Sequence, residues 1–237
     1  MSKKIAALIF GHNEYAFEVA KNVKHKYEDI TIFKLSSDEK LEYDKNYDIK
    51  NFDFSDDWDD LVENFNMKNS IAFCMLEDDA QNIFLTISLR SMFEDLTIFA
   101  LSKNKESAHK HTMAGANKVI PVVQTTANII SDMLRKPIIT GILHNILYEK
   151  SNLKVAQIKV NNGGCFNGKN PSDIDWGRDY GIIVLFVMQD DLSKEFVYSS
   201  RAKHHDIKTG DIFIVVGYDA DIKEFEKLIG GDSCVLE

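Results

Sequence analysis

The sequence predicts an α/β protein with a doubly wound parallel sheet, followed by a helical connector and a smaller α+β domain. Short β-rich runs alternate with longer amphipathic runs over residues 5–121, a pattern typical of a parallel sheet with helices on both faces. Pro137 separates two helical stretches, and strand-like runs follow one another closely after Asn152. A chain of 237 residues is long enough for two domains with separate cores.

The first 136 residues contain the alternating elements. Strands are expected at 5–10, 29–35, 48–52, 70–76, 96–101 and 118–120. Helices are expected between them at 14–26, 56–65, 78–93 and 104–113. The apolar side chains of these helical stretches recur at the spacing of one buried helix face. We therefore assign residues 1–136 to a Rossmann-like domain.

The connector, residues 137–152, is expected to follow a first helix at 125–135 and to hold a second at 138–150. Proline tends to end or kink a helix, so Pro137 marks the turn between the two helices. The second helix carries an apolar stripe formed by Ile138, Ile142, Leu143, Ile146 and Leu147. This stripe is more apolar than a solvated linker requires, and it packs either on its own domain or on another chain.

Residues 153–237 form the predicted second domain. Strands are expected at 155–160, 182–188, 195–198 and 212–216, with a terminal helix at 220–228. Polar residues at 189–193 separate two of these strands and predict a hairpin loop.

Composition argues against several function classes. Acidic residues outnumber basic ones by 37 to 28 and give a net charge of −9, so nucleic acid is not an expected partner. The apolar runs are far shorter than the roughly 18 residues that cross a bilayer. The three cysteines are widely spaced and indicate neither a disulfide framework nor a metal site. We expect a cytoplasmic protein in which residues 5–10 form a strand rather than part of a signal peptide.

The turn after the first strand is a candidate phosphate-binding loop. Residues 11–16 read Gly-His-Asn-Glu-Tyr-Ala, a partial match to G-x-G-x-x-G/A. Gly11 allows a tight turn and Ala16 allows close packing of helix on strand. Asn13 replaces the middle glycine; asparagine tolerates positive φ, but its side chain crowds the pyrophosphate position. The loop by itself fits a dinucleotide site and a purely structural turn equally well.

The end of the second strand is more discriminating. NAD-binding proteins normally place a carboxylate there, which accepts hydrogen bonds from the ribose. This chain has Lys34 instead, and an ammonium cannot accept those bonds. Together with Ser36 and Ser37, Lys34 either faces a phosphate or is simply solvated.

Other motifs are weaker. Residues 163–169 match G-x-x-x-x-G-K, but Asn170 and Pro171 supply neither the magnesium-binding hydroxyl nor a simple helix start, so a P-loop is not expected. His109 and His111 lie two apart on a predicted helix and do not face each other. Residues 204–206, His-His-Asp, are interpreted as a polar loop in preference to a cation site.

Acidic groups at 56–60 and 77–79 are placed to cap helices, with calcium binding as the less favoured alternative. No catalytic residues are predicted, because the Tyr-x-x-x-Lys pair, the G-x-S-x-G elbow and the H-E-x-x-H helix are all missing from the sequence.

Over nearly its whole length the chain resembles the RCK family, the regulators of K⁺ conductance. The resemblance rests on the loop at 11–16, on Asp53 after the third strand, and on residues 78–82, which match D-D-x-x-N. Its most specific part is 114–121, Ala-Gly-Ala-Asn-Lys-Val-Ile-Pro, similar to the family's A-G-A-D-x-V-x-P. The second domain resembles the RCK C-terminal domain.

The resemblance implies a non-catalytic, ligand-sensing regulatory subunit or domain of a potassium channel or transporter. It implies a ligand site outside the strand ends, formed by Gly11, His12, Asn13, Glu14, Ala16, Lys34, Asp53, Glu77 and Asn82. An adenine nucleotide is the best candidate ligand: ATP, ADP or NAD(P). Lys34 favours the ligands with more phosphate.

The resemblance also implies partners: a second copy in a homodimer, possibly a larger ring, and a membrane pore that would hold the chain at the inner face of the membrane. Leu101 and Lys103 stand where some calcium-gated members have carboxylates, so calcium gating through that site is not expected. The alternative function is an NAD(P)-dependent oxidoreductase, which only the Rossmann-like half favours.

Overall fold

The computed structural model describes residues 4–36, 46–55, 58–148, 151–161, 166–188, 194–196 and 206–230. The chain divides into two compact units, Met1–Ser131 and Asp132–Glu237. The division falls inside helix α5 (Val122–Arg135), and the predicted boundary after residue 136 lies just beyond the end of that helix.

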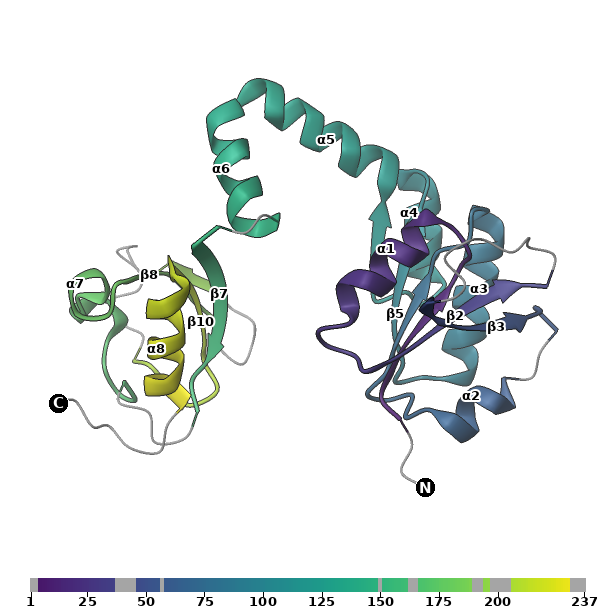
Figure 1. The fold of residues 1–237 in the computed structure, drawn as a ribbon, viewed down its shortest axis with the longest axis horizontal. Helices are drawn as coiled ribbons and strands as arrows, with labels where there is room; N and C mark the ends of the chain where they lie inside the picture. Colours follow the sequence, from purple (N-terminus) through teal and green to yellow (C-terminus); the bar gives the residue numbers. More distant parts are fainter. Residues whose placement is uncertain are drawn as a thin grey trace. The chain divides into compact units, whose positions relative to one another are not determined.

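The first unit is built on a six-stranded sheet (Figure 1). Its strands are β1 (Ala6–Phe10), β2 (Asp29–Leu35), β3 (Asp48–Phe52), β4 (Ile71–Cys74), β5 (Thr97–Ser102) and β6 (Lys118–Pro121). They are all parallel and lie in the order β3-β2-β1-β4-β5-β6. This is the strand order of doubly wound dinucleotide-binding folds, so the predicted fold class is confirmed.

Four helices connect these strands: α1 (Glu14–Val23), α2 (Asp59–Asn64), α3 (Asp79–Met92) and α4 (Lys105–Met113). Three of these helices are capped at the N-terminus by a side chain that accepts a hydrogen bond from a backbone amide of the first turn. The capping residues are Asn13 for α1, Asp78 for α3 and Asn104 for α4. Helices α1 and α2 are shorter than expected. Trp58 has a φ of 61° directly before α2, so the helix begins after it; residues 56 and 57 lie outside the described part of the chain.

Strand β1 lies at the centre of the unit and is buried on both faces. Ala6, Leu8 and Phe10 belong to one apolar cluster, and Ala7 and Ile9 belong to a second cluster on the other face. A parallel sheet covered on both sides needs such a continuous apolar strand, because each face packs against helices.

The connector contains α5 and α6 (Pro137–Tyr148). Helix α5 begins directly after β6, three residues before the start predicted from the sequence. Pro137 is the first residue of α6, where its missing N–H costs nothing. The turn at Pro137 is therefore confirmed.

The second unit contains a four-stranded antiparallel sheet in the order β7-β10-β8-β9. Its strands are β7 (Leu153–Lys159), β8 (Ile182–Met188), β9 (Lys194–Phe196) and β10 (Ile212–Tyr218), and its helices are α7 (Trp176–Tyr180) and α8 (Asp219–Gly230). Trp176, Phe166, Phe213 and Phe225 form an aromatic core. The predicted α+β domain is confirmed, whereas the predicted loop at 189–193 lies outside the described residues.

Candidate functional site

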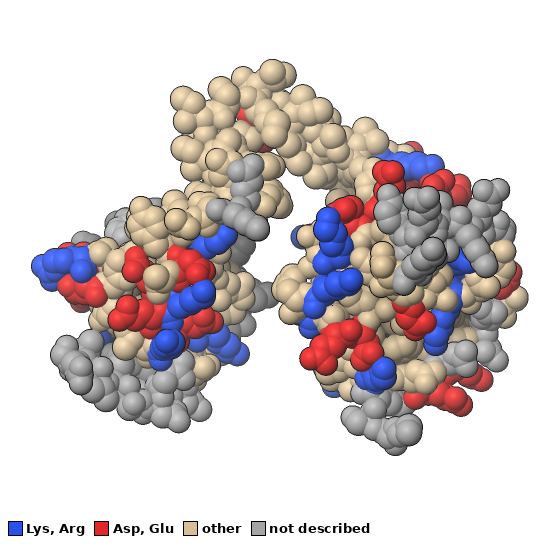
Figure 2. All heavy atoms as spheres, viewed as in Figure 1, with Lys and Arg blue, Asp and Glu red and all other residues tan. Residues whose placement is uncertain are grey.

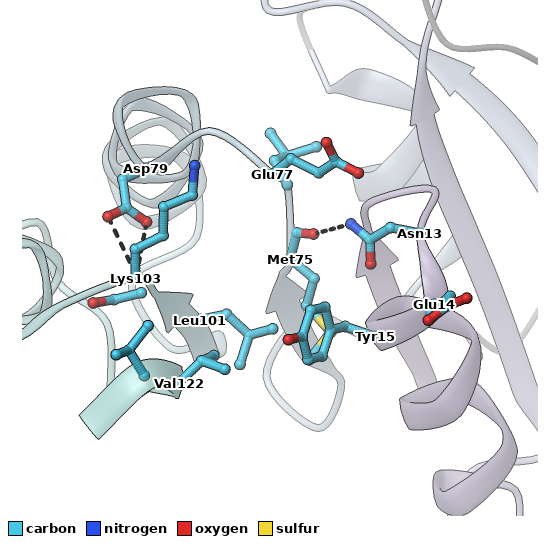
Figure 3. Close-up of a pocket in the computed structure, with 12 residues that line it drawn as sticks. Asn13, Glu14, Tyr15, Met75, Glu77, Asp79, Leu101, Lys103 and Val122 are labelled. Atoms are coloured by element: carbon cyan, nitrogen blue, oxygen red, sulfur yellow. Dashed lines mark hydrogen bonds between the residues drawn. The ribbon is translucent and has the colours of Figure 1, made fainter. Parts of the chain in front are cut away.

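A cleft of about 460 Å³ opens at the carboxyl ends of β1, β4 and β5 (Figure 3). Its walls come from residues 13–15 after β1, 75–77 after β4, 101–103 at the end of β5, and 122–123 in the first turn of α5; Asp79 completes the lining. The strand order reverses between β1 and β4, and the crevice at such a switch point is where doubly wound sheets bind ligands.

The turn after β1 is fastened to the end of β4. Gly11 has a φ of 150°, and a Cβ added there would lie 2.5 Å from the Met75 carbonyl oxygen, so only glycine fits. Asn13 donates a hydrogen bond to that same oxygen at 2.7 Å, and its own side-chain oxygen accepts from the Ala16 amide at 3.1 Å. Asn13 has a φ of −147°, so the tolerance of asparagine for positive φ is not used at this position. Its function in the turn is to cap α1 and anchor β4.

Asn82 supports the cleft from behind. The residue is 1% exposed, and its side-chain oxygen accepts a hydrogen bond from the Leu76 amide at 2.9 Å. Its nitrogen donates to the carbonyl oxygens of Leu76, at 3.0 Å, and Leu101, at 3.4 Å. Asn82 therefore holds together the two strand ends that form the floor of the cleft, and its amide is engaged by the protein's own backbone.

The cleft carries more negative than positive charge. Its lining includes three carboxylates, Glu14, Glu77 and Asp79, and one ammonium, Lys103. The Lys103 backbone amide donates a hydrogen bond to the Asp79 carboxylate, whose two oxygens lie 3.1 and 3.3 Å from the amide nitrogen. This bond ties α3 to the end of β5. An anionic group is therefore disfavoured at this end of the site, whereas hydroxyl and amine donors find acceptors there.

Lys34 and Asp53 lie on the other side of β1, at β2 and after β3. Lys34 is only 9% exposed, and in the register of the two strands it faces Asn51. Asp53 accepts hydrogen bonds from the Ser55 amide and hydroxyl, which lower the pKa of its carboxyl. Neither residue lines the cleft, and Ser37 lies outside the described residues.

The predicted site residues therefore separate into groups. Asn13, Glu14 and Glu77 line the cleft. The remaining six lie elsewhere: Gly11 and His12 in the turn, Ala16 in the first turn of α1, Lys34 and Asp53 toward β2 and β3, and Asn82 behind the floor.

Several lining residues were not predicted: Tyr15, Met75, Leu76, Asp79, Leu101, Ser102, Lys103, Val122 and Val123. Most of them lie in the last two residues of a parallel strand or directly after it, so their position at a shared sheet edge was available as a signal. Val122 and Val123 were missed because the helix was expected to start at residue 125.

The segment at 114–121 is structural. Gly115 has a φ of 100°, and its carbonyl oxygen accepts a hydrogen bond from Arg90 Nε at 3.0 Å. The Asn117 side-chain oxygen accepts from the Ile98 amide and from Arg90 Nη2, both at 2.7 Å. These bonds fix β6 beside β5 and so determine where α5 starts.

The weaker motifs give no further site. After Lys169 the chain forms a 3₁₀ turn, Pro171–Asp173, which Asn170 caps; residues 163–165 and 204–205 lie outside the described part. Within the described residues, no three His, Cys, Asp or Glu side chains are grouped to hold a metal ion. In the same part of the chain, none of the helices has both the length and the hydrophobicity that a membrane crossing requires.

Residues 7–122 match the family model of the TrkA-N domain. This part of the chain is a TrkA-N domain. Across 160 residues the chain is 23% identical to the probable potassium channel protein 2 of Methanocaldococcus jannaschii, a match that covers 65% of this chain and 45% of that protein. The chain thus spans less than half the length of this relative.

Two solved structures are similar to this chain over more than nine tenths of its length. The human SLO3 gating ring has a TM-score of 0.62 at 9% identity, over 92% of this chain and 45% of that one. The GsuK RCK domain has a TM-score of 0.47 at 16% identity, over 95% and 46% of the two chains. The RCK resemblance predicted from the sequence is confirmed by the TrkA-N match, and the likeness to the SLO3 gating ring shows the fold.

Proposed function

We propose that this chain is a cytosolic, ligand-sensing regulatory subunit or domain of a potassium channel or transporter. The observation that carries the proposal is a cleft at the switch point of a TrkA-N domain. The probable potassium channel from M. jannaschii and the SLO3 gating ring, a part of another protein with the same fold, support this function class.

Coupling would run through α5. Strand β6 passes into α5 without an intervening loop, and the first two residues of the helix, Val122 and Val123, line the cleft. The helix then continues into the first residues of the second unit. A ligand that contacts Val122 and Val123 would favour one position of α5, and a difference in affinity between two positions is what ligand-driven gating requires.

An adenine nucleotide, ATP, ADP or NAD(P), is the proposed ligand. The buried Lys34 favours phosphate on the β2 side of β1, while Glu14 and Glu77 disfavour it in the cleft. We therefore expect the phosphates near the turn after β1, with an uncharged or cationic part of the ligand in the cleft.

Binding is tested by calorimetry with ATP, ADP, NADP and NAD on the wild type and two variants. Val123→Arg fills the cleft wall and should reduce affinity at least tenfold. Ile129→Arg adds the same side chain to an exposed position farther along α5 and should leave affinity within about twofold. Equal loss in both variants, or no binding to the wild type, would contradict the nucleotide site.

Gating is tested with this chain and the pore protein that co-purifies with it, reconstituted in liposomes. The nucleotide that binds should change K⁺ flux, and Val123→Arg should remove that response. A flux that is insensitive to every bound nucleotide would contradict the regulatory function.

We also propose that the chain is not an enzyme, and the oxidoreductase alternative has a direct test. NADH and NADPH should not be oxidised when they are incubated for a long time with the protein and small carbonyl compounds. Sustained oxidation of either nucleotide would favour the alternative.

Self-association through the connector is a further part of the proposal. Every apolar side chain of the predicted stripe except Ile146 is at least 49% exposed, and none of the described residues of α5 or α6 is buried. Helix α6 carries no charged residue, and the face of α5 and α6 seen in Figure 2 is almost free of charge. Exposed apolar surface of this extent marks an interaction site, and a second copy in a homodimer, or in a larger ring, would cover it.

A further inference from the structure

The side chains at the two ends of the cleft lining are apolar and exposed. Tyr15, which follows β1, is 57% exposed, and Val123, in the first turn of α5, is 66% exposed. Strands β4 and β5 lie between β1 and β6, and Figure 3 shows Tyr15 on one side of Leu101 and Val122 on the other. Ligand sites normally bury most of the ligand, and a mouth of this kind does so only when another surface covers it.

Val123 is also the first residue of an apolar stripe along α5. Ala127, Ile130 and Leu134 follow it at four, seven and eleven residues, the spacing of one helix face. Ile130 is 54% exposed and Leu134 is 80% exposed. The acidic and the basic residue of α5 do not share this spacing, so the stripe carries no charge. One apolar surface therefore continues from the mouth of the cleft along the helix.

The chemistry of the stripe indicates what covers it. The partner has to be apolar, because a charged group placed on the stripe would lose its hydration without gaining an ion pair or a hydrogen bond. The chain itself carries such a surface: α6 has no charged residue, and Ile142 and Leu143 on it are 53% and 49% exposed. In a pair related by a two-fold axis, each copy can offer its α6 to the α5 of the other, which covers both helices in one step.

We propose that a second copy of this chain closes the cleft by packing on the α5 stripe, so that ligand affinity depends on self-association. This inference rests on the proposed function, in which the cleft is the ligand site and the connector binds a second copy. A ligand enclosed between two copies binds the pair more tightly than it binds the single chain. Linkage then requires that the ligand strengthens pairing by the same factor.

The closure is tested without a ligand. Val123→Cys places a thiol at the mouth of the cleft, and a maleimide should modify it more slowly as the protein concentration rises and light scattering detects pairs. Val62→Cys on α2 is the control, because Val62 is also an exposed helical valine, and its rate should not depend on concentration. The wild type gives the background rate of the native cysteines.

The stripe is tested with two adjacent isoleucines. Ile130→Arg puts a charge on the stripe two helical turns after Val123, so the chain should stay monomeric and the Val123→Cys thiol should react fast at every concentration. At a concentration where the wild type is paired, Ile130→Arg should also weaken ATP binding about fivefold or more. Ile129→Arg, about 100° away round the helix, should leave the mass unchanged and the affinity within about twofold.

Three outcomes overturn the proposal: a wild type that stays monomeric, a Val123→Cys thiol that reacts equally fast in monomers and pairs, or an Ile130→Arg variant that behaves like Ile129→Arg. ATP binding that does not depend on protein concentration would likewise overturn the coupling, while leaving the ligand site of the proposed function intact. Protection of the Val123→Cys thiol in a pair that binds no ATP would contradict the nucleotide ligand and support the interface.

Discussion

Strand β1 and helix α6 are both strongly apolar, yet one is completely buried and the other is exposed. Every side chain of β1 has 0% exposure, because helices cover both faces of its sheet. Helix α6 has no buried residue among those described. An apolar segment therefore has to be covered, but its sequence does not show whether the same chain covers it.

The largest difference in unfolding free energy is expected when leucine is replaced by alanine in each of the two regions. Leu8→Ala removes a fully buried side chain from β1 and should cost about 2–5 kcal/mol of unfolding free energy. Leu143→Ala on α6 should cost less than about 0.5 kcal/mol when the chain is dilute enough to be monomeric. Urea denaturation measures both, and similar losses would mean that α6 is covered within its own chain.

Two glycines, one after β1 and one inside α6, differ in the same way in how closely their backbone is packed. Gly11→Ala places a Cβ 2.5 Å from the Met75 carbonyl at a φ of 150° and should destabilise by roughly 1–3 kcal/mol. A Cβ at Gly141, inside α6, meets nothing within 4 Å, so Gly141→Ala should stabilise by about 0.5–1 kcal/mol. Thermal denaturation gives the two signs, and a stabilised Gly11→Ala would show that the turn is not closely fastened to β4.

Self-association would cover the exposed apolar side chains of α6. Ile142→Asp combined with Ile146→Asp puts two charges into the apolar stripe of α6 and should reduce the dimer or ring to monomers, with little change in the fold of the single chain. Light scattering at high micromolar concentration measures the mass. A monomeric wild type, or a double variant of unchanged mass, would contradict self-association through α6.

The smallest effect is expected at Lys34, a polar residue in the buried half of the comparison. Lys34→Asp restores the carboxylate that accepts ribose hydrogen bonds and should shift preference from ATP, ADP and NADP toward NAD by about 1 kcal/mol, the net contribution of a typical hydrogen bond. Lys50→Asp on the adjacent strand is the control for charge alone. In calorimetry, the wild type should bind NAD more weakly than ATP, ADP and NADP. The opposite order of affinities would contradict the inference from Lys34.

The order of the elements could be predicted from the sequence because it depends on local patterns. Alternating β-rich and amphipathic runs placed all six strands of the first sheet, and Pro137 located the break between α5 and α6. Local patterns also located the turn at Gly11, since a glycine directly after a buried strand marks a sharp change of direction.

Side-chain roles in the cleft depended on tertiary structure. Asn13 bonds to Met75 and Asn82 bonds to Leu101, and these partners come from other strands of the sheet. The hydrogen bond from the Lys103 backbone amide to the Asp79 carboxylate likewise requires α3 and the end of β5 to meet. A sequence shows which residues need hydrogen bonds or burial, but the packing of distant segments decides which atoms provide them.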